Sequence, residues 1–331
     1  MFEVFSICPS STGVPGEAYV ESVIDVARWS ETAGHKGMLV HSDNSLVDPW
    51  LLSHVVVQHT MALCPLVAVQ PVYMHPYWVA KQVASIAHLY RRRLYLNMVA
   101  GGFTNDLEAL NDTTPHDKRY VRLVEYTTIA MRLLSSPAPL TYLGAFYSVL
   151  KLKLTPPIHE GLVPGVFVSG SSDAGLAAAR MLGAIGVKYP NPADQEQFPP
   201  DDLGNAAIRV GIVARETDEE AWAVAQERFP EGRKEQRTHQ LPMKVSDSPR
   251  HEVRSVLEDR SAERSPYWLA PFHDYKTMCP YLVGSYDRVA RELARYIALG
   301  CGTFILDVPY SQEELQHTSV SFERAIGAVQ A

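Results

Sequence analysis

Residues 165–176 read GVFVSGSSDAGL, and this stretch decides the fold class. An apolar run reaches Gly170, meets two serines, and passes into an Ala-rich segment that Asp173 opens. Short apolar runs bounded by small residues are typical of buried strands, and alanine favours a helix. The stretch therefore predicts a strand that runs directly into a helix, with unpaired amides and two hydroxyl groups at the junction.

The same order of strand and helix recurs along the chain. Eight apolar runs suited to buried strands lie at residues 2–8, 37–41, 65–71, 93–101, 165–170, 184–189, 206–214 and 302–310. Most are followed by segments of helical periodicity, although residues 191–205 carry too many Pro and Gly residues for a helix. Continuously apolar strands that alternate with helices predict an α/β fold with a parallel sheet, here a (β/α)8 TIM barrel that forms one domain over residues 1–331.

Two stretches interrupt this order. Residues 139–157 alternate around a central Gly144 and predict a hairpin inserted before the fifth strand. Residues of about 230–283, between the seventh and eighth strands, are polar, charged and poor in aliphatic side chains. Such a segment is expected to be a lid over the barrel mouth or a subunit contact.

The composition is that of an ordinary globular protein. With 46% hydrophobic and 20% charged residues, the chain can bury a sizeable core without disulfides or metals. A formal net charge of −7 argues against a nucleic-acid partner and an anionic membrane surface. Since there is no signal peptide and no apolar run of about 18 residues, we expect a cytoplasmic protein without a membrane span. Four widely spaced cysteines without a CxxC indicate buried, reduced thiols.

The end of the fifth strand is the strongest candidate site, because barrel enzymes build their sites at the carboxyl ends of the strands. Gly170 lets an anion approach the backbone, and Ser171 and Ser172 add hydroxyl donors to the first amides of the helix. This pattern predicts a phosphate site; the alternative is that a serine only caps the helix. No GxGxxG, GxxxxGK[ST] or HExxH motif occurs, and the histidines lack ligand spacing, so we predict no Rossmann site, no P-loop and no metal.

A set of further motifs resembles the luciferase-like flavin monooxygenases and is most similar to their alkanesulfonate monooxygenase branch. In the order and near the spacing of that family, between about residues 37 and 310, they read LVHSDNSLVDPW, LVAVQP, NMVAGG, HDKRY, FVSGSSDAG, IRVGIVARETDEEAW and RVARELARYIALGCGTFIL. The resemblance implies a barrel that binds reduced FMN from a separate flavin reductase. The flavin would react with O2 to a C4a-peroxide and insert one oxygen atom into a small organic substrate. The resemblance also favours a homodimer or homotetramer.

The same resemblance implies which residues hold the flavin. The GSSD turn would bind its phosphate. Asn97 in NMVAGG and Tyr120 in HDKRY match positions that contact the flavin, and Ala100 stands where the branch has a threonine. Gln70, after the third strand, and His116, before the fourth helix, are further candidates. The cofactor-binding candidates are therefore Gln70, Asn97, Ala100, His116, Tyr120, Gly170, Ser171 and Ser172.

The departures from the branch lie in its substrate half. Leu46 stands in place of the active-site cysteine, and Gly211 stands in place of a histidine, although Arg209 matches the family's arginine. Pro309 replaces an aromatic residue, which makes the adjacent Tyr310 a candidate. These changes indicate a substrate other than a simple alkanesulfonate, such as an intermediate of secondary metabolism.

Candidate roles follow from these positions. The catalytic candidates are His41, Arg209 and Tyr310, and the substrate candidates are Asn44, Leu46, Tyr73 and Lys276, the cation nearest to a missing loop arginine. A neutral imidazole at residue 41 could hydrogen-bond a substrate, or it could be a packing or solvated histidine. A buried arginine at 209 needs either a structural carboxylate or an anionic ligand. The expected wall that keeps water from the flavin comprises Tyr73, Met74, Tyr189, Phe272 and Tyr275.

Two other functions stay open from the sequence. The losses at positions 46 and 211 also suit a non-catalytic flavin-binding protein or the inactive partner of a heterodimer. Related barrels use the deazaflavin F420 for hydride transfer, so that an F420-dependent oxidoreductase is the further alternative.

Overall fold

A closed barrel of eight parallel strands forms the centre of the molecule. The computed structural model describes residues 2–199, 204–230, 265–274 and 276–330. The barrel strands are β1 (Glu3–Ile7), β2 (Gly37–Val40), β3 (Cys64–Val69), β4 (Tyr95–Val99), β7 (Gly165–Ser169), β8 (Ile185–Lys188), β9 (Ala206–Arg215) and β12 (Cys301–Leu306). Each pairs with the next, and β9 pairs with both β8 and β12 to close the ring. All eight coincide with the apolar runs in the sequence, so the predicted TIM barrel is confirmed.

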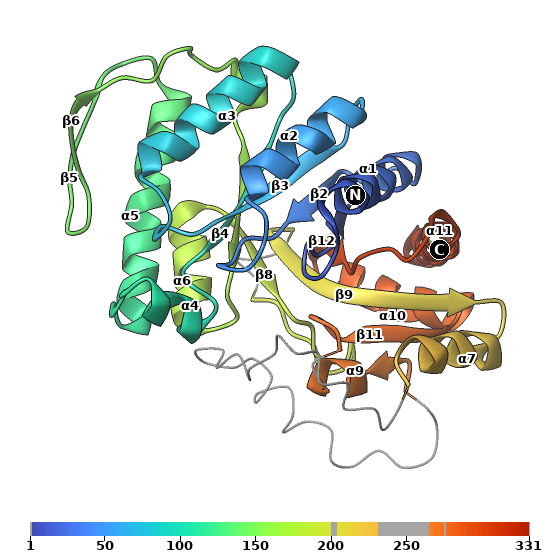
Figure 1. Ribbon diagram of the computed structural model, residues 1–331. Coiled ribbons are helices and arrows are strands. Elements are labelled where there is room, and N and C mark those ends of the chain that lie inside the picture. The colour runs from blue at the N-terminus through green and yellow to red at the C-terminus, as the bar shows by residue number, and fades with distance from the viewer. Residues whose placement is uncertain (1, 200–203, 231–264, 275, 331) are drawn as a thin grey trace.

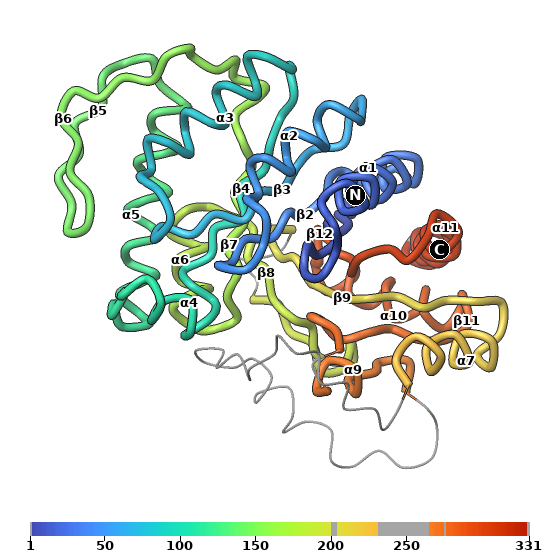
Figure 2. Tube along the Cα trace, in the orientation of Figure 1, coloured from blue at the N-terminus to red at the C-terminus, as the bar shows by residue number. Residues whose placement is uncertain are grey.

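Helices cover the outside of the barrel, as Figures 1 and 2 show. They are α1 (Gly16–Thr32), α2 (Pro49–His59), α3 (Pro76–Tyr90), α4 (Thr104–Ala109), α5 (His116–Ser135), α6 (Asp173–Leu182), α7 (Asp218–Arg228), α10 (Tyr286–Ala298) and α11 (Gln312–Gln330), with a 3-10 turn at Glu160–Leu162. Because helices cover the outer face and side chains fill the interior, the strands are buried on both faces and read as continuous apolar runs. Within the described ranges, none of these helices is both long and apolar enough to cross a bilayer.

Aromatic side chains fill the barrel interior. The ring of Phe5 meets the rings of Tyr95 and Phe167 edge-on, with 5.4 and 5.5 Å between centroids. Tyr95 and Phe167 meet in the same way at 5.9 Å. Because large side chains close the interior, the barrel is a packed core, and ligands can bind only at its ends.

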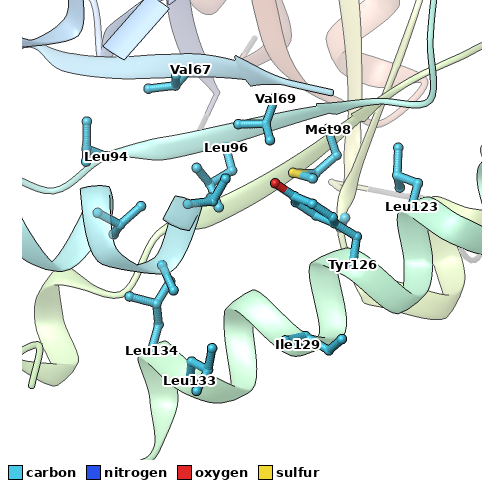
Figure 3. Packing of buried hydrophobic residues seen from close by; sticks show 14 of the residues in the cluster. Val67, Val69, Leu94, Leu96, Met98, Leu123, Tyr126, Ile129, Leu133 and Leu134 are labelled. Carbon is cyan, nitrogen blue, oxygen red and sulfur yellow. The ribbon is translucent and has the colours of Figure 1, made fainter. Parts of the chain in front are cut away.

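A second core lies between the sheet and the helices α3 and α5. Figure 3 shows strand side chains facing the inner surface of α5, with Tyr126 reaching toward Met98. The members labelled there are Val67, Val69, Leu94, Leu96, Met98, Leu123, Tyr126, Ile129, Leu133 and Leu134. This packing fixes α5, whose first turn lies beside the barrel mouth.

The hairpin predicted before the fifth barrel strand is present and consists of β5 (Leu140–Leu143) and β6 (Ser148–Leu152), which pair antiparallel. It projects past α5 in Figure 1. The buried carboxylate of Glu125 accepts hydrogen bonds from the amides of Ala145, Phe146 and Tyr147, and thereby ties the hairpin turn to α5.

Strand β9 is longer than the barrel requires and divides between two sheets. Its first half, up to Val210, pairs with β8 and β12, and its second half, from Gly211, pairs with β11 (Tyr281–Ser285). The insertion predicted between the seventh and eighth barrel strands is present. Its last part forms β10 (Tyr267–Trp268), α9 (Ala270–His273) and β11, which pack beside β9. Residues 231–264 lie outside the described residues, so the lid stays a prediction.

Candidate active site

The carboxyl ends of the barrel strands bring together most of the residues that the sequence indicated. His41 and Gln70 come directly after β2 and β3, Asn97 lies in β4, and the turn at Gly170 follows β7. Because parallel strands end on the same side of a barrel, these residues belong to one mouth.

The turn between β7 and α6 is where the sequence predicts an anion site. Ser172 is the N-cap residue of α6, and its Oγ accepts a hydrogen bond from the Gly175 amide at 3.3 Å. The capping interpretation is therefore correct for this hydroxyl, whose own hydrogen can still be donated. The first amides of α6 carry partial positive charge at this end of the helix, which favours a bound anion.

Tyr120 closes this turn from the side of α5. A Cβ atom on Gly170 would lie 2.2 Å from the Tyr120 Oη, and a Cβ atom on Gly175 would lie 3.1 Å from it. The His116 ring packs edge-on against the Tyr120 ring, with 5.2 Å between centroids. Position 170 therefore has no room for a side chain. Three of the predicted cofactor residues, Gly170, Tyr120 and His116, lie together at this turn.

The end of β4 is held by polar contacts on both sides. The Ser169 hydroxyl donates to the Asn97 Oδ1 at 2.8 Å, which fixes the side-chain amide of that asparagine. The Arg119 guanidinium donates to the Gly101 carbonyl at 3.0 Å, where the backbone has a φ of +116°. Ala100, which lies between Asn97 and Gly101 in the sequence, is buried. The position of the missing threonine is therefore closed off from bulk solvent.

The loops after β2 and β3 are linked to each other and to α4. The Tyr73 hydroxyl donates to the Asn44 Oδ1 at 2.8 Å, and the Asn44 side-chain amide donates to the Asp106 carbonyl at 3.1 Å. The Gln70 amide donates to the Ser42 carbonyl at 2.9 Å. Burial, followed by the charges of Asp106 and a neighbouring aspartate, raises the pKa of Tyr73, so this phenol stays protonated. Leu46 is half-buried in the same loop, where it offers no reactive group.

His41 and Arg209 place unpartnered donors inside the mouth. In the part of the chain that the structure describes, the His41 Nε2 and the Arg209 Nε and Nη2 are buried and have no hydrogen-bond partner. Burial, reinforced by the Arg209 charge, lowers the pKa of His41 to about 3, so its imidazole is neutral at physiological pH. The structural ion pair considered for Arg209 does not form with any described carboxylate, which leaves the anionic ligand as the interpretation.

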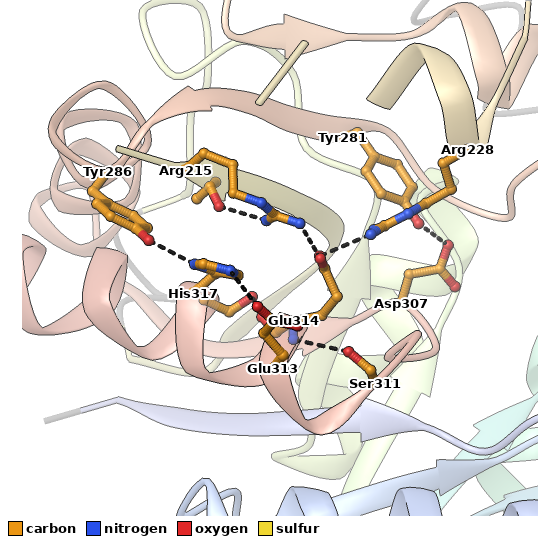
Figure 4. A network of polar contacts seen from close by, with 11 residues as sticks. Arg215, Arg228, Tyr281, Tyr286, Asp307, Ser311, Glu313, Glu314 and His317 are labelled. Carbon is orange, nitrogen blue, oxygen red and sulfur yellow. Dashed lines mark hydrogen bonds and ion pairs between the residues drawn. The ribbon is translucent and has the colours of Figure 1, made fainter. Parts of the chain in front are cut away.

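Position 211 has no room for a side chain, because the Tyr281 ring of β11 occupies the space. A Cβ atom there would lie 2.3 Å from the Tyr281 ring, and the Tyr281 hydroxyl donates to the Asp307 Oδ2 at 2.8 Å (Figure 4). The sequence treated residue 281 as part of the polar insertion, and so missed both members of this pair. The short, continuously apolar run YLV, which follows a proline and ends at Gly284, was the signal that could have indicated a strand there.

Two predicted residues make contacts of another kind. Tyr310 is 60% exposed, and the Arg228 guanidinium stacks on its ring at 4.1 Å. The Lys276 Nζ donates to the Pro230 carbonyl at 2.6 Å and lies 3.7 Å from the Asp274 carboxylate. Neither contact tests a role in the reaction, so both roles stay predictions.

The predicted aromatic wall is described only in part. The Tyr189 and Phe272 rings pack together with 5.1 Å between centroids, Met74 packs against the core beside α3, and Tyr275 lies outside the described residues. Beside the mouth, a cavity of about 400 Å³ is lined by residues of α4, the loop that follows it, and Arg119. A cavity of about 720 Å³ lies between α1, α11 and the start of β1, at the opposite end of the strands. Because barrel chemistry belongs to the carboxyl ends, we assign no substrate to that larger cavity.

The mouth fits a planar cofactor that ends in a phosphate, such as FMN. The α6 amides and the Ser172 hydroxyl suit the phosphate, and the absence of a Cβ atom on Gly170 lets the Tyr120 phenol pack against this turn. Among the described residues, no cluster of three His, Cys, Asp or Glu side chains is arranged to hold a metal ion.

A closed parallel barrel with polar side chains at the carboxyl ends of its strands is the architecture of a barrel enzyme. The chain belongs to the luciferase-like monooxygenase family, whose model matches residues 1–302. It is therefore an enzyme of the flavin-dependent monooxygenase class, and the resemblance found in its sequence is confirmed.

Known relatives support this assignment. The 4-(gamma-L-glutamylamino)butanoyl-(BtrI acyl-carrier protein) monooxygenase BtrO of Niallia circulans is 33% identical over 309 residues, which cover 91% of this chain and 90% of the relative. The oxygenating constituent of 3,6-diketocamphane monooxygenase from Pseudomonas putida, solved with FMN, is 17% identical, with a TM-score of 0.69 over 98% of this chain and 96% of that one. An F420-dependent secondary alcohol dehydrogenase, solved with an F420–acetone adduct, is 16% identical, with a TM-score of 0.65 over 100% and 99%. The two solved structures share the fold, and the family as a whole includes users of FMN and of F420.

Proposed function

We propose that this protein is the oxygenating component of a two-component system and takes reduced FMN from a separate flavin reductase. Reduced flavin at the mouth would supply the activation of O2, from which one oxygen atom passes to a small organic substrate. The observation that supports the proposal is the turn from Gly170 to Ser172, where small residues, the first amides of α6 and the Tyr120 phenol lie together and would bind an anion.

The work of the chain's own residues is to bind, orient and exclude water. The start of α6 would bind the phosphate, and Asn97, held by Ser169, would contact the flavin. His41 is neutral at working pH, so its Nε2 can donate or accept a hydrogen bond without adding a charge. The Tyr189 and Phe272 rings supply an apolar wall, which matters because activated flavins lose their oxygen to water.

The proposed substrate is something other than a simple alkanesulfonate. Leu46 provides no thiol, and the Tyr281 ring fills the space above Gly211 where a histidine would stand. BtrO acts, by its name, on an acyl group carried by an acyl-carrier protein. We propose a related acyl intermediate of secondary metabolism for this chain, either free or bound to a carrier.

Titrations of the purified protein separate the candidate cofactors. Under anaerobic conditions, quenching of tryptophan fluorescence should report binding of reduced FMN. Riboflavin, which lacks the phosphate, should bind at least about tenfold more weakly, because it forfeits charge-assisted hydrogen bonds. Equal affinity for riboflavin would remove the phosphate anchor, and binding of reduced F420 alone would establish the F420-dependent alternative instead.

Turnover distinguishes an enzyme from a flavin carrier. The protein, FMN, a flavin reductase with NAD(P)H as the electron donor, and ¹⁸O2 should convert an acyl thioester to a product that contains one ¹⁸O atom, while the other oxygen atom is reduced to water. The same protein without the reductase is the control. Tight FMN binding without an oxygenated product, across free and carrier-bound acyl groups, would favour the non-catalytic flavin-binding protein or heterodimer partner.

We further propose a homodimer or homotetramer in the cytoplasm. Exposed apolar side chains on the outer helices, Leu51 on α2 and Trp78 and Leu89 on α3, offer a surface for a second copy. All four cysteines are free and buried, which suits a reducing compartment. Light scattering should give two or four times the chain mass, and a monomer at micromolar concentration would contradict the assembly.

A further inference from the structure

A carboxylate stands where a partner for the half-buried Arg209 would be expected. Arg209 of β9 is in register with Ile305 of β12, and Asp307, two residues beyond Ile305, is the first residue after the end of β12. Side chains two residues apart in a strand lie on the same face, so Arg209 and Asp307 belong to the same side of the mouth. The Cys279 thiol is buried, and the charges of Asp307 and Arg209 both affect its pKa.

Asp307 nevertheless makes its contacts elsewhere. Its Oδ2 accepts the Tyr281 hydroxyl at 2.8 Å, and its Oδ1 accepts the Val308 amide at 2.9 Å. Burial, followed by the adjacent carboxylate, raises the pKa of the Cys279 thiol well above its usual value, so the third neighbour is also uncharged. Over the described residues, Arg209 has no ion pair within 4.0 Å, and its Nε and Nη2 stay unpartnered.

Packing fixes the Tyr281 hydroxyl on this carboxylate. The ring lies directly over the backbone of Gly211 on one side, and it meets the Phe229 ring edge-on at 5.1 Å on the other. A backbone hydrogen bond from the Gly211 amide to the Pro280 carbonyl, 2.8 Å long, anchors the start of β11. The phenol therefore has little freedom to turn away from Asp307.

Arg228 also pairs with a residue other than Asp307. Arg228 lies close to Tyr281 and Asp307 in Figure 4, yet it forms an ion pair with Glu314 at 2.9 Å. Glu314 also pairs with Arg215, so this carboxylate forms ion pairs with both Arg215 and Arg228. Arg215 and Arg228 thus each have a carboxylate partner in this network, whereas Arg209 has none among the described residues.

We propose that Tyr281 is a positioning residue that keeps Asp307 away from Arg209, and that Arg209 is thereby left to bind an anionic group of the substrate, such as a carboxylate. The inference rests on the proposed function for the identity of the ligand as a substrate. Arg209 is half-buried, and its buried Nε and Nη2 atoms without partners are costly to the fold, so a ligand anion that pairs with them recovers that cost as affinity. The neutral imidazole of His41 beside it offers a further hydrogen bond.

The experiment uses acetate as a minimal carboxylate and acetamide as its uncharged counterpart. Full-length protein with isotope-labelled histidine is titrated at constant ionic strength, and the chemical shifts of the His41 ring report binding at the adjacent Arg209. Wild type should bind acetate in preference to acetamide, and Arg209→Gln should lose the response. Tyr281→Phe should weaken acetate binding about tenfold or more, because the released Asp307 can pair with Arg209.

Two further variants test the cause. Tyr281→Phe combined with Asp307→Asn should restore acetate binding, since the amide cannot neutralise the guanidinium. Tyr267→Phe is the matched control, because this buried tyrosine of the adjacent β10 donates its hydroxyl to the Pro190 carbonyl at 2.6 Å and not to Asp307. Its variant should bind acetate like wild type. Wild-type affinity in Tyr281→Phe, or no recovery in the double variant, would overturn the inference.

A last arm separates the substrate from the cofactor. The acetate titration is repeated with FMN bound: retained acetate binding assigns the anion site to the substrate, whereas competition with FMN would assign it to the flavin phosphate and overturn the inference. Because acetate binding needs no flavin and no turnover, failure of the oxygenase proposal would leave this result standing, and the two can be told apart.

Discussion

Replacing Gly170 by alanine is expected to weaken FMN binding and to destabilise the fold together. The new Cβ would lie 2.2 Å from the Oη and 3.0 Å from the Cζ of Tyr120, well inside the favourable separation of about 3.5–4.0 Å between non-bonded atoms. Tyr120 is only 9% exposed, so the phenol cannot swing out into water. Either the turn or the first part of α5 must therefore move.

The structure allows both magnitudes to be estimated. Overpacking of a buried contact lowers the free energy of unfolding by about 1–3 kcal/mol. If the displaced turn loses one charge-assisted hydrogen bond to the flavin phosphate, binding weakens by about 1.5–3 kcal/mol, which is roughly 10- to 150-fold in Kd. Combining Gly170→Ala with Tyr120→Phe removes the shortest contact, so part of the lost stability should return.

Urea denaturation and FMN titration measure the two effects. Gly186→Ala in the neighbouring β8 is the matched control, because its Cβ would lie 3.8 Å from the nearest atom, an ordinary van der Waals contact. That variant should be close to wild type in both assays. Were Gly170→Ala to match Gly186→Ala in stability and in FMN affinity, the reasoning about this turn would be refuted.

Three other predictions follow from local contacts. Thr217→Ala removes the capping box at the start of α7 and should lower the free energy of unfolding by about 1 kcal/mol without changing FMN affinity, so an unaltered urea midpoint would contradict it. Glu125→Ala removes the acceptor for three hairpin amides, so limited proteolysis near Gly144 should accelerate while circular dichroism keeps the barrel signal; wild-type cleavage rates would count against this. Because the folded-state pKa of His41 is lowered to about 3 from its usual value of 6.5, the unfolded chain binds this proton first as the pH falls. Stability should therefore fall from about pH 6.5 toward pH 3 by at most about 1.4 kcal/mol per pH unit from this group, and His41→Gln should show a shallower slope in denaturation at successive pH values.

The barrel could be predicted because each strand has the same local surroundings. A parallel strand inside a ring of helices is buried on both faces, so an apolar run bounded by small residues is sufficient to indicate it. The junction at Gly170 could also be predicted from local sequence, because a strand, a small-residue turn and an N-cap serine follow one another along the chain. The hairpin of residues 140–152 was likewise visible from its alternation and its central glycine.

The second sheet was hidden because its evidence is not local. The pairing of Gly211 with Tyr281 joins residues seventy positions apart, and the polar segment before β11 obscured a short apolar strand. Position 211 therefore looked like a loss, whereas the phenol of Tyr281 takes the space of the absent side chain.

The order of buried and small residues along the chain is sufficient to predict eight barrel strands, the family, and a turn that suits a phosphate. The contact between Asp307 and Tyr281, and the lack of a carboxylate partner for Arg209 among the described residues, are visible only once the strands are assembled. Which charges meet depends on the register of β9 with β12 and on the packing of β11 above Gly211, and neither is a property of any one segment.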